Sequence, residues 1–305
     1  MHKATNMNNE NNIKKNSLKA WILAARPKTL TGASVPVMIA LALAWANVGQ
    51  DGFKVLPAVL CMLFAFVMQI DANFVNDYFD FKSGKDDEER LGPPRACQMG
   101  WIDAPVMLRG IIACTVLACI IGLPLAFLAG WEMIVIGALC VLFCFLYTTF
   151  MAQHAMGDVL VLVFFGLVPV CATYYIQSGS VTPTVVAAAI ACGLVIDTLL
   201  VVNNYRDIHN DARAGKRTLI VAIGERAGRA IYLCLGFVAC IIGIVFAVDG
   251  HLWATLLPAV YLLLHVKAYR NMVRIGEGRE LNNVLAETAR NMFIYGLTVA
   301  IGLII

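Results

Sequence analysis

The sequence of 305 residues is poor in charge: only 14% of its residues are Asp, Glu, Lys or Arg, whereas 60% are hydrophobic. Apolar runs of about 20 residues recur along it, which is the length that a helix needs to cross a lipid bilayer. The runs lack the apolar/polar alternation of barrel strands, so helices remain as the structure that satisfies backbone polar groups in lipid. The sequence therefore excludes a soluble domain and predicts an all-α integral membrane protein.

Other features are also absent. The first 20 residues contain no apolar stretch ending in a small-residue cleavage site, so they do not resemble a signal peptide. We expect a disordered polar tail at 1–20 and a single transmembrane domain at 21–305. The ten cysteines form no CxxC pair and lie mostly in apolar runs, which predicts reduced, packed thiols. A net charge of +3 is too small to indicate a nucleic-acid partner.

Apolar runs bounded by polar clusters predict nine transmembrane helices. The predicted spans are 30–47, 55–76, 105–129, 131–150, 157–177, 181–203, 229–248, 252–270 and 287–305. All but one of the 23 Lys and Arg residues fall on one side of this arrangement, and the exception is Lys54. Because cytoplasmic loops carry an excess of Lys and Arg, that side is predicted to be cytoplasmic, with the N-terminus inside and the C-terminus outside.

An acidic stretch, NDYFDFKSGKDDEERLGPPR at 76–95, directly follows the second predicted span. We expect the helix of that span to continue from the membrane into water. Residues three or four apart share a helix face, so Asn73, Asp77 and Asp80 form one stripe, with Asn76 one turn below Asp80. The stretch therefore presents several oxygen ligands in one direction.

A second stretch, NNYRDIHNDARAGKRT at 203–218, follows the sixth predicted span on the same side, and Asn203, Asp207 and Asp211 repeat the helical spacing. Aspartates beside a membrane cost energy unless something offsets their repulsion. Mg²⁺ prefers carboxylate oxygens and commonly bridges to phosphate. The two stretches together predict a site for Mg²⁺ and a diphosphate, whereas either one alone would be an ordinary solvated loop.

Nearby cations are predicted to bind the remaining phosphate oxygens, because guanidinium and ammonium groups form strong charge-assisted hydrogen bonds. The candidates are Lys82, Arg90, Arg95, Lys216, Arg217 and the pair Arg26 and Lys28. The last pair also fits the role of a positive anchor at the membrane surface.

These residues resemble the UbiA superfamily of intramembrane prenyltransferases, in the form typical of its naphthoate-prenylating members. Asn76, Asp77 and Asp80 match the first superfamily motif, whereas Gly84 stands where the last Asp of that motif would be. NDYxDxxxG followed by an acidic run and ERLGPxR is the form of the naphthoate group. NNYRD with GKRTL matches the second motif, and ARPKTL and GDVLVLVFFGLVPV are further matches. A departure follows Tyr147, where YTTFMAQHAMGD lacks the Gly-Pro that this group often carries.

The resemblance implies nine transmembrane helices around a central cavity. It implies Mg²⁺-dependent transfer of a polyprenyl chain from polyprenyl diphosphate to 1,4-dihydroxy-2-naphthoate, with loss of CO₂, to give a demethylmenaquinone in the bacterial cytoplasmic membrane. Another ring, 4-hydroxybenzoate or homogentisate, is the alternative acceptor. The implied ligands of Mg²⁺ and diphosphate are Asn76, Asp77, Asp80, Asp207 and Asp211, with Asp86 replacing the missing acid.

Four further residues keep two interpretations each. Asn73 and Asn203 serve as metal or diphosphate ligands, or as hydrogen-bond partners between helices. Asp158, which matches the family's GD pair, either positions a Lys or Arg or polarises the acceptor's hydroxyl, or instead caps a helix N-terminus. Tyr147 either bounds the prenyl path near the reacting carbon or belongs to an interfacial aromatic belt.

Asp71 and Asp197 lie inside predicted spans, where an ionisable residue is a functional candidate by default. The alternative is that each simply pairs with a neighbour. They are also the support for a rival class, a secondary transporter with carboxylates at mid-membrane. That class predicts acids at membrane depth, whereas the acids of this sequence concentrate at one rim.

Overall fold

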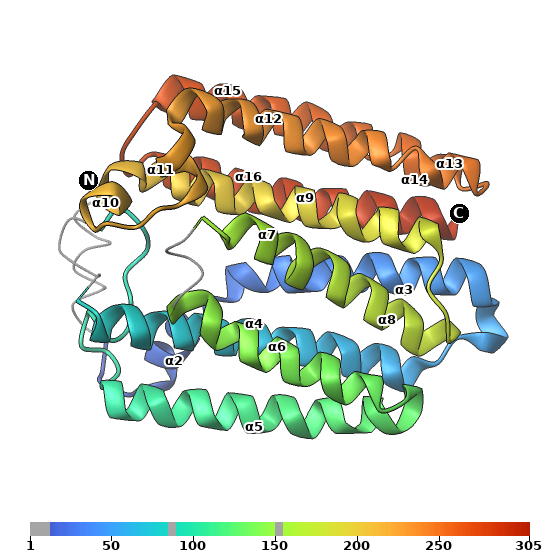
Figure 1. Ribbon diagram of the computed structural model, residues 1–305, viewed down its shortest axis with the longest axis horizontal. Coiled ribbons are helices and arrows are strands. Elements are labelled where there is room, and N and C mark those ends of the chain that lie inside the picture. Colours follow the sequence, from blue (N-terminus) through green and yellow to red (C-terminus); the bar gives the residue numbers. More distant parts are fainter. Residues whose placement is uncertain (1–12, 85–89, 150–154) are drawn as a thin grey trace.

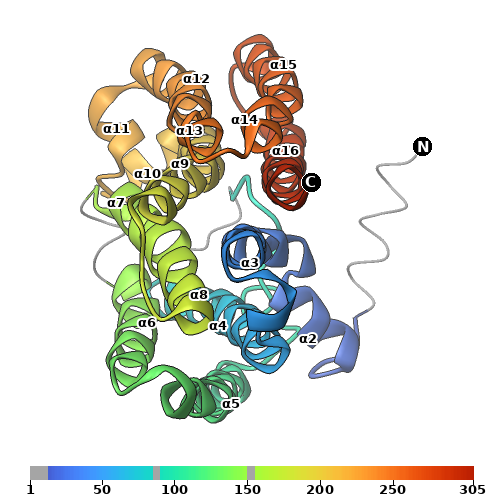
Figure 2. The same cartoon turned by 90° about the vertical axis from the view of Figure 1, so that its right-hand side faces the viewer.

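The computed structural model describes residues 13–84, 90–149 and 155–305, and helix is the regular structure throughout these ranges. The long helices run side by side along one axis (Figure 1). In the view along that axis, α3, α8 and α9 lie between α12 and α15 on one side and α5 and α6 on the other (Figure 2). The prediction of an all-α membrane protein is confirmed.

Each predicted span coincides with a long helical segment. These segments are α3 (Leu30–Gly52), α4 (Val55–Lys82), α5 (Ala104–Ala129), α6 (Glu132–Thr149), α9 (Pro183–Arg206), α12 (Glu225–Ile242), α15 (Ala259–Ile275) and α16 (Leu281–Ile304), together with the continuous run of α7 (Gly157–Val161), the π-helical η3 (Leu162–Leu167) and α8 (Val168–Ser178). The shorter elements are α2 (Leu18–Ala25), η1 (Pro27–Thr29), α10 (Ile208–Arg213), α11 (Leu219–Ile223), α13 (Val245–Val248) and α14 (Leu252–Leu256).

Seven helical segments of the described chain are long and apolar enough to cross a membrane. The seven do not include α6, whose apolar part is shorter, or α16. The count of nine spans, the central cavity and the side on which the N-terminus lies therefore stay predictions. We call the end of the bundle that holds α10, α11 and the connecting residues 90–103 and 276–280 the basic end (Figure 1).

Two helix boundaries matter for the site. The predicted extension of the second span is confirmed, because α4 runs on to Lys82. α2 begins at Leu18, inside the range predicted as a polar tail, and the Ser17 hydroxyl caps it by accepting from the amide of Ala20. Residues just before it are held too, by an ion pair of 2.7 Å between Lys15 and Asp103. The domain boundary at residue 20 stays a prediction.

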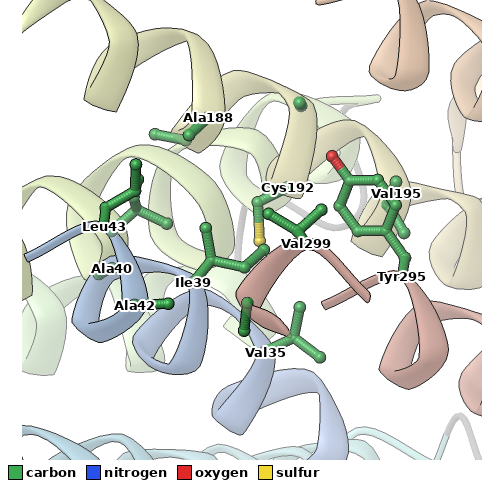
Figure 3. Close-up of a cluster of buried hydrophobic side chains, with 14 of the residues drawn as sticks. Val35, Ile39, Ala40, Ala42, Leu43, Ala188, Cys192, Val195, Tyr295 and Val299 are labelled. Atoms are coloured by element: carbon green, nitrogen blue, oxygen red, sulfur yellow. The ribbon is translucent and has the colours of Figure 1, made fainter. Parts of the chain in front are cut away.

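The largest apolar core joins α3, α9 and α16 (Figure 3). On α3, residues 35, 39 and 43 recur at intervals of four and therefore share one face, which is fully buried. Cys192 and Val195 of α9 and Tyr295 and Val299 of α16 pack against that face. This core fixes α9, which carries the second acidic stretch at its end.

Glycines let the backbone of α9 touch that of η3. A Cβ atom on Gly166 would lie 2.6 Å from the carbonyl oxygen of Ala189 and 2.8 Å from the Cα of Gly193. A Cβ atom on Gly193 would in turn lie 3.1 Å from the carbonyl oxygen of Leu162. Small residues permit this kind of close approach between membrane helices, and it locks the relative register of α9 and η3.

Substitution of Gly166 by Ala is expected to destabilise the protein, because the new methyl group meets backbone atoms that cannot move aside. Overpacking of this kind costs about 1–3 kcal/mol. Gly137→Ala in α6 is the matched control, since a Cβ there meets nothing within 4 Å. Thermal unfolding in detergent should show a lower midpoint for Gly166→Ala and no loss for Gly137→Ala; equal midpoints would contradict the close packing.

Candidate functional site

Asp77 holds a backbone turn rather than pointing to solvent. Its side chain is fully buried, and its two carboxylate oxygens accept hydrogen bonds from the amides of Ala96 at 2.8 Å and Cys97 at 2.9 Å. This geometry favours a role for Asp77 in positioning the backbone over the predicted role of metal ligand. The sequence pattern could not reveal these hydrogen bonds, because they depend on how residues 90–103 return to α4.

Asp80 lies one turn further along α4 and pairs with an arginine. Arg95 Nη1 lies 2.6 Å from Asp80 Oδ2, and the same nitrogen donates to the carbonyl oxygen of Asn76 at 2.5 Å. Both side chains are largely buried, so the ion pair is shielded from water and stronger than one on the surface. Asp77 fixes Ala96, the residue after Arg95, and thereby helps to position this guanidinium.

Asn73 connects α4 to the ARPKTL segment. Its amide nitrogen donates to the carbonyl oxygen of Ala25 and to the Thr29 hydroxyl, both at 2.9 Å. This geometry favours the hydrogen-bond interpretation of Asn73 over the metal-ligand interpretation. It also places Arg26, which has a left-handed backbone conformation with φ of 50°, on the turn beside α4.

The second stretch is organised by Arg206, at the last residue of α9. Its guanidinium forms two bonds to Asp207, from Nε to Oδ1 at 2.8 Å and from Nη2 to Oδ2 at 2.5 Å. It also donates to Asn203 Oδ1 at 2.9 Å and to Asn282 Oδ1 at 2.8 Å. Sequence reasoning missed this role of Arg206, although an arginine in NNYRD between two predicted ligands was a usable signal.

Asp211 is buried on α10 beside Lys216. The Lys216 ammonium lies 3.3 Å from Asp211 Oδ1. Burial raises the pKa of the Asp211 carboxyl, and the neighbouring ammonium acts in the opposite direction. The Lys216 ammonium therefore offsets part of the effect of burial on this carboxyl.

The ERLGP segment joins the two stretches. Asn282, which binds Arg206, donates through Nδ2 to the carbonyl oxygen of Leu91 at 2.8 Å. A Cβ atom on Gly92 would lie 3.1 Å from Arg206 Nη2 and 3.2 Å from Arg90 Nη2, so glycine gives the two guanidinium groups room to approach the backbone. The last residues of the first stretch thus pack directly on the second stretch.

Tyr147, near the end of α6, lies among carboxylates from both stretches. The side chains of Asp80, Asp211, Asp158 and Asp197 all lie close enough to its hydroxyl to act on it electrostatically. The ends of α4, α6 and α9 and the start of α7 meet at the basic end (Figure 1). The structure therefore brings together two predicted acids that lie far apart in the sequence.

The other predicted cations are more exposed. Lys28, Lys82 and Arg217 are exposed at the basic end, and the Lys82 ammonium lies 5.5 Å from the centre of the Tyr78 ring. Arg90 donates to the carbonyl oxygen of Pro93 at 3.2 Å. Asp86 lies outside the described residues.

Asp71 has a structural partner. Its Oδ2 accepts a hydrogen bond of 2.7 Å from the Thr115 hydroxyl, which connects α4 to α5. This observation favours the interpretation that Asp71 pairs with a neighbour, and it removes one of the two residues that supported a transporter.

The donor set fits Mg²⁺ by its chemistry, because Asp80, Asp207 and Asp211 offer the hard carboxylate oxygens that this ion prefers. In the part of the chain that the structure describes, no three His, Cys, Asp or Glu side chains converge to hold a metal ion. Instead each of the three carboxylates contacts an Arg or Lys nitrogen. The acids and their cations thus form three ion pairs that a metal and an anionic ligand could divide between them.

Fold and site together define a multi-pass helical membrane protein with a cluster of acidic and basic side chains at one end of an apolar bundle. A family model described as the UbiA prenyltransferase family matches residues 33–297. The chain belongs to this family.

A curated relative from Haemophilus influenzae, named 1,4-dihydroxy-2-naphthoate octaprenyltransferase, is 34% identical over 302 residues, which cover 94% of this chain and 96% of the relative. Among solved structures, a UbiA homolog from Aeropyrum pernix aligns with a TM-score of 0.67 at 14% identity, over 88% of this chain and 97% of its own. A UbiA homolog from Archaeoglobus fulgidus, bound to GPP and Mg²⁺, aligns with a TM-score of 0.62 at 16% identity, over 92% of this chain and 99% of its own. The two structures are similar to this chain in fold.

Asp77→Ala is expected to loosen the turn at residues 95–97, because two buried amides lose their acceptor. An unsatisfied buried group costs about 1–3 kcal/mol, so local opening should become about tenfold more frequent or more. Cys97, which is 4% exposed, reports this opening. Mapping of maleimide labelling by mass spectrometry should show faster modification of Cys97 in Asp77→Ala than in wild type. The exposed Asp51→Ala serves as control, and unchanged Cys97 labelling in Asp77→Ala would refute the role of Asp77.

Proposed function

We propose that this protein transfers a polyprenyl chain from a polyprenyl diphosphate to 1,4-dihydroxy-2-naphthoate, with loss of CO₂, as a Mg²⁺-dependent step of menaquinone biosynthesis. The observation that carries the proposal is that Asp80 and Asp211, from the two acidic stretches, each pair with a cation and both lie near enough to Tyr147 to act on its hydroxyl electrostatically. Membership of the UbiA prenyltransferase family supports the reaction class. The name of the Haemophilus influenzae relative supports the acceptor.

The proposed role of the basic end is to make the diphosphate a leaving group. An allylic diphosphate ionises when the charge on its leaving group is neutralised, and Mg²⁺ supplies that neutralisation when it is bound. Asp80, Asp207 and Asp211 are the residues proposed to hold the ion. Arg95 and Lys216, which contact Asp80 and Asp211 here, are proposed to donate to phosphate oxygens.

The apolar bundle is proposed to protect the carbocation that ionisation leaves behind. A prenyl cation reacts with water, so the reaction needs a water-poor space that also accommodates a long isoprenoid chain. Electron-rich ring carbons then attack the cation. Among the acceptors that the sequence leaves open, the NDYFD and ERLGPPR forms favour the naphthoate over 4-hydroxybenzoate and homogentisate.

The charge bias of the connections supports a location in a bacterial cytoplasmic membrane with the basic end in the cytoplasm. On this orientation, both acidic stretches and the candidate cations at Arg26, Lys28 and Lys82 face the cytoplasm. Asn76, Arg90, Asn203 and Arg217 stay proposed contacts of the same site.

The proposed reaction is tested with purified protein in detergent, radiolabelled polyprenyl diphosphate and a panel of aromatic acceptors. We expect a prenylated product and CO₂ with 1,4-dihydroxy-2-naphthoate, and loss of the product when EDTA removes divalent metal. Transfer to 4-hydroxybenzoate but not to the naphthoate would overturn the acceptor assignment, and full activity in EDTA would overturn the role of Mg²⁺.

Asp80→Ala and Asp211→Ala test the residues of the site. Each is expected to lower prenyl transfer by about 100-fold or more, because each removes a carboxylate proposed to hold the Mg²⁺ that offsets the charge developing on the diphosphate leaving group. Asp103→Asn is the matched control, since Asp103 is an acid at the same end that forms an ion pair with the exposed Lys15. Rates for Asp80→Ala and Asp211→Ala close to that of Asp103→Asn would contradict the proposed site.

A further inference from the structure

The packing of η3 on α9 sets Asp158 opposite Asp197. The two segments are antiparallel, since the chain turns back between Ser178 and Pro183. Gly193 of α9 contacts Leu162, as the position of its Cβ shows. One helical turn toward the basic end from this contact leads to Asp158 on one segment and to Asp197 on the other.

A second contact confirms this register. A Cβ atom on Gly157 would lie 3.3 Å from Leu200 Cδ2, so the residue before Asp158 meets the residue three places after Asp197. Residues three and four apart share a helix face, and Gly193, Asp197 and Leu200 therefore lie on the face of α9 that packs against α7 and η3. The two aspartates belong to one interface.

The carboxylates of this interface lack partners. Neither oxygen of Asp158 accepts a hydrogen bond from another residue of the described chain, Oδ1 of Asp197 has no partner there either, and all three atoms are shielded from solvent. The residue that caps α7 is Met156, so Asp158 does not serve as a helix cap. Buried polar groups without partners cost stability. The register places both aspartates in the α7–α9 interface, and an ionisable residue at such a depth in a membrane protein is a functional candidate by default.

Their surroundings indicate what that function is. Asp158 and Asp197 both act on the Tyr147 hydroxyl, as Asp80 and Asp211 do. The Tyr147 hydroxyl would lie 4.0 Å from a Cβ on Gly157, which places it against the start of α7. Asp197 precedes Asp207 by ten residues on α9, which is roughly 15 Å along a helix. The pair therefore lies deeper in the bundle than the diphosphate residues. A π-helical segment, a feature often found at functional sites, follows Asp158 directly.

We propose that Asp158 and Asp197 form a proton-holding pair for the hydroxyl group of the acceptor ring. This inference rests on the proposed function and deepens it, because it assigns the acceptor's position to the α7–α9 interface. An aromatic ring that bears a hydroxyl group supplies the donor that the orphaned oxygens lack. Two facing carboxylates in an apolar environment share a proton rather than both being charged, which leaves one of them to accept.

One aspartate of the pair would accept the hydroxyl proton during ring attack and give it back after CO₂ leaves. As the ring carbon that bears the carboxylate bonds to C1 of the prenyl cation, the neighbouring O–H bond breaks, its electrons form a carbonyl group, and an aspartate takes the proton. The bond to the carboxylate then breaks, and CO₂ leaves. Its electron pair restores the aromatic ring, and the oxygen takes the proton back. No net proton, oxidant or reductant is needed.

The test separates attack by the ring from ionisation of the diphosphate. The same purified protein is assayed for prenyl transfer and, without acceptor, for Mg²⁺-dependent release of diphosphate from geranyl diphosphate. Asp158→Asn and Asp197→Asn are expected to lower transfer by about 100-fold or more, as loss of a general base does, with diphosphate release unchanged. Asp158→Glu and Asp197→Glu keep a carboxylate and should recover part of the transfer.

Asp71→Asn is the matched control, because Asp71 is also a buried intramembrane aspartate with one unpartnered oxygen but binds Thr115 on α5. It should leave both rates unchanged. Transfer that stays near wild type in either Asn variant overturns the pair. Equal loss of transfer and diphosphate release also overturns it, because that result indicates a structural role. The wild-type protein separately tests the acceptor. If it prenylates another hydroxylated ring and not the naphthoate, the proposed acceptor is wrong, and the variants are then assayed with that other ring.

Discussion

Charge compensation at the basic end is the constraint on which the rest of this structure depends. Aspartates at the ends of apolar helices are stable only when something offsets their charge. Backbone amides do so for Asp77, and Arg95 and Arg206 do so for Asp80 and Asp207. The contacts of Asp77 and Asp80 tie α4 to residues 95–97, and Asn282, which binds both Arg206 and the carbonyl oxygen of Leu91, links the same connection to α9. They allow two acidic stretches to approach the same tyrosine.

The sequence alone predicted what depends on local periodicity. It placed the long helices, the extension of α4 to Lys82 and the acids at the two helix ends, because apolar run length and three- or four-residue spacing are local properties. It did not predict the partners of Asp77 or the bridge from Arg206 to Asn282, since these depend on how distant segments meet.

For a related reason, the sequence alone did not predict that Asp158 lies opposite Asp197. Their alignment follows from the glycine contacts between η3 and α9, and the register of two packed helices cannot be obtained from either helix alone. The apolar core around α3, α9 and α16 fixes this register from the other side of α9. A rigid interior thus positions polar groups at two depths, with ion pairs at the rim and orphaned carboxylates below them.

The central claim is that the acids of both stretches bind one metal–diphosphate unit. A structure of the protein with Mg²⁺ and a non-hydrolysable geranyl thiodiphosphate tests it most directly. The account predicts metal density in contact with Asp80 and Asp211, with Arg95 and Lys216 turned from these carboxylates to phosphate oxygens. A diphosphate bound elsewhere, with the ion pairs of Asp80 and Asp211 intact, would contradict it.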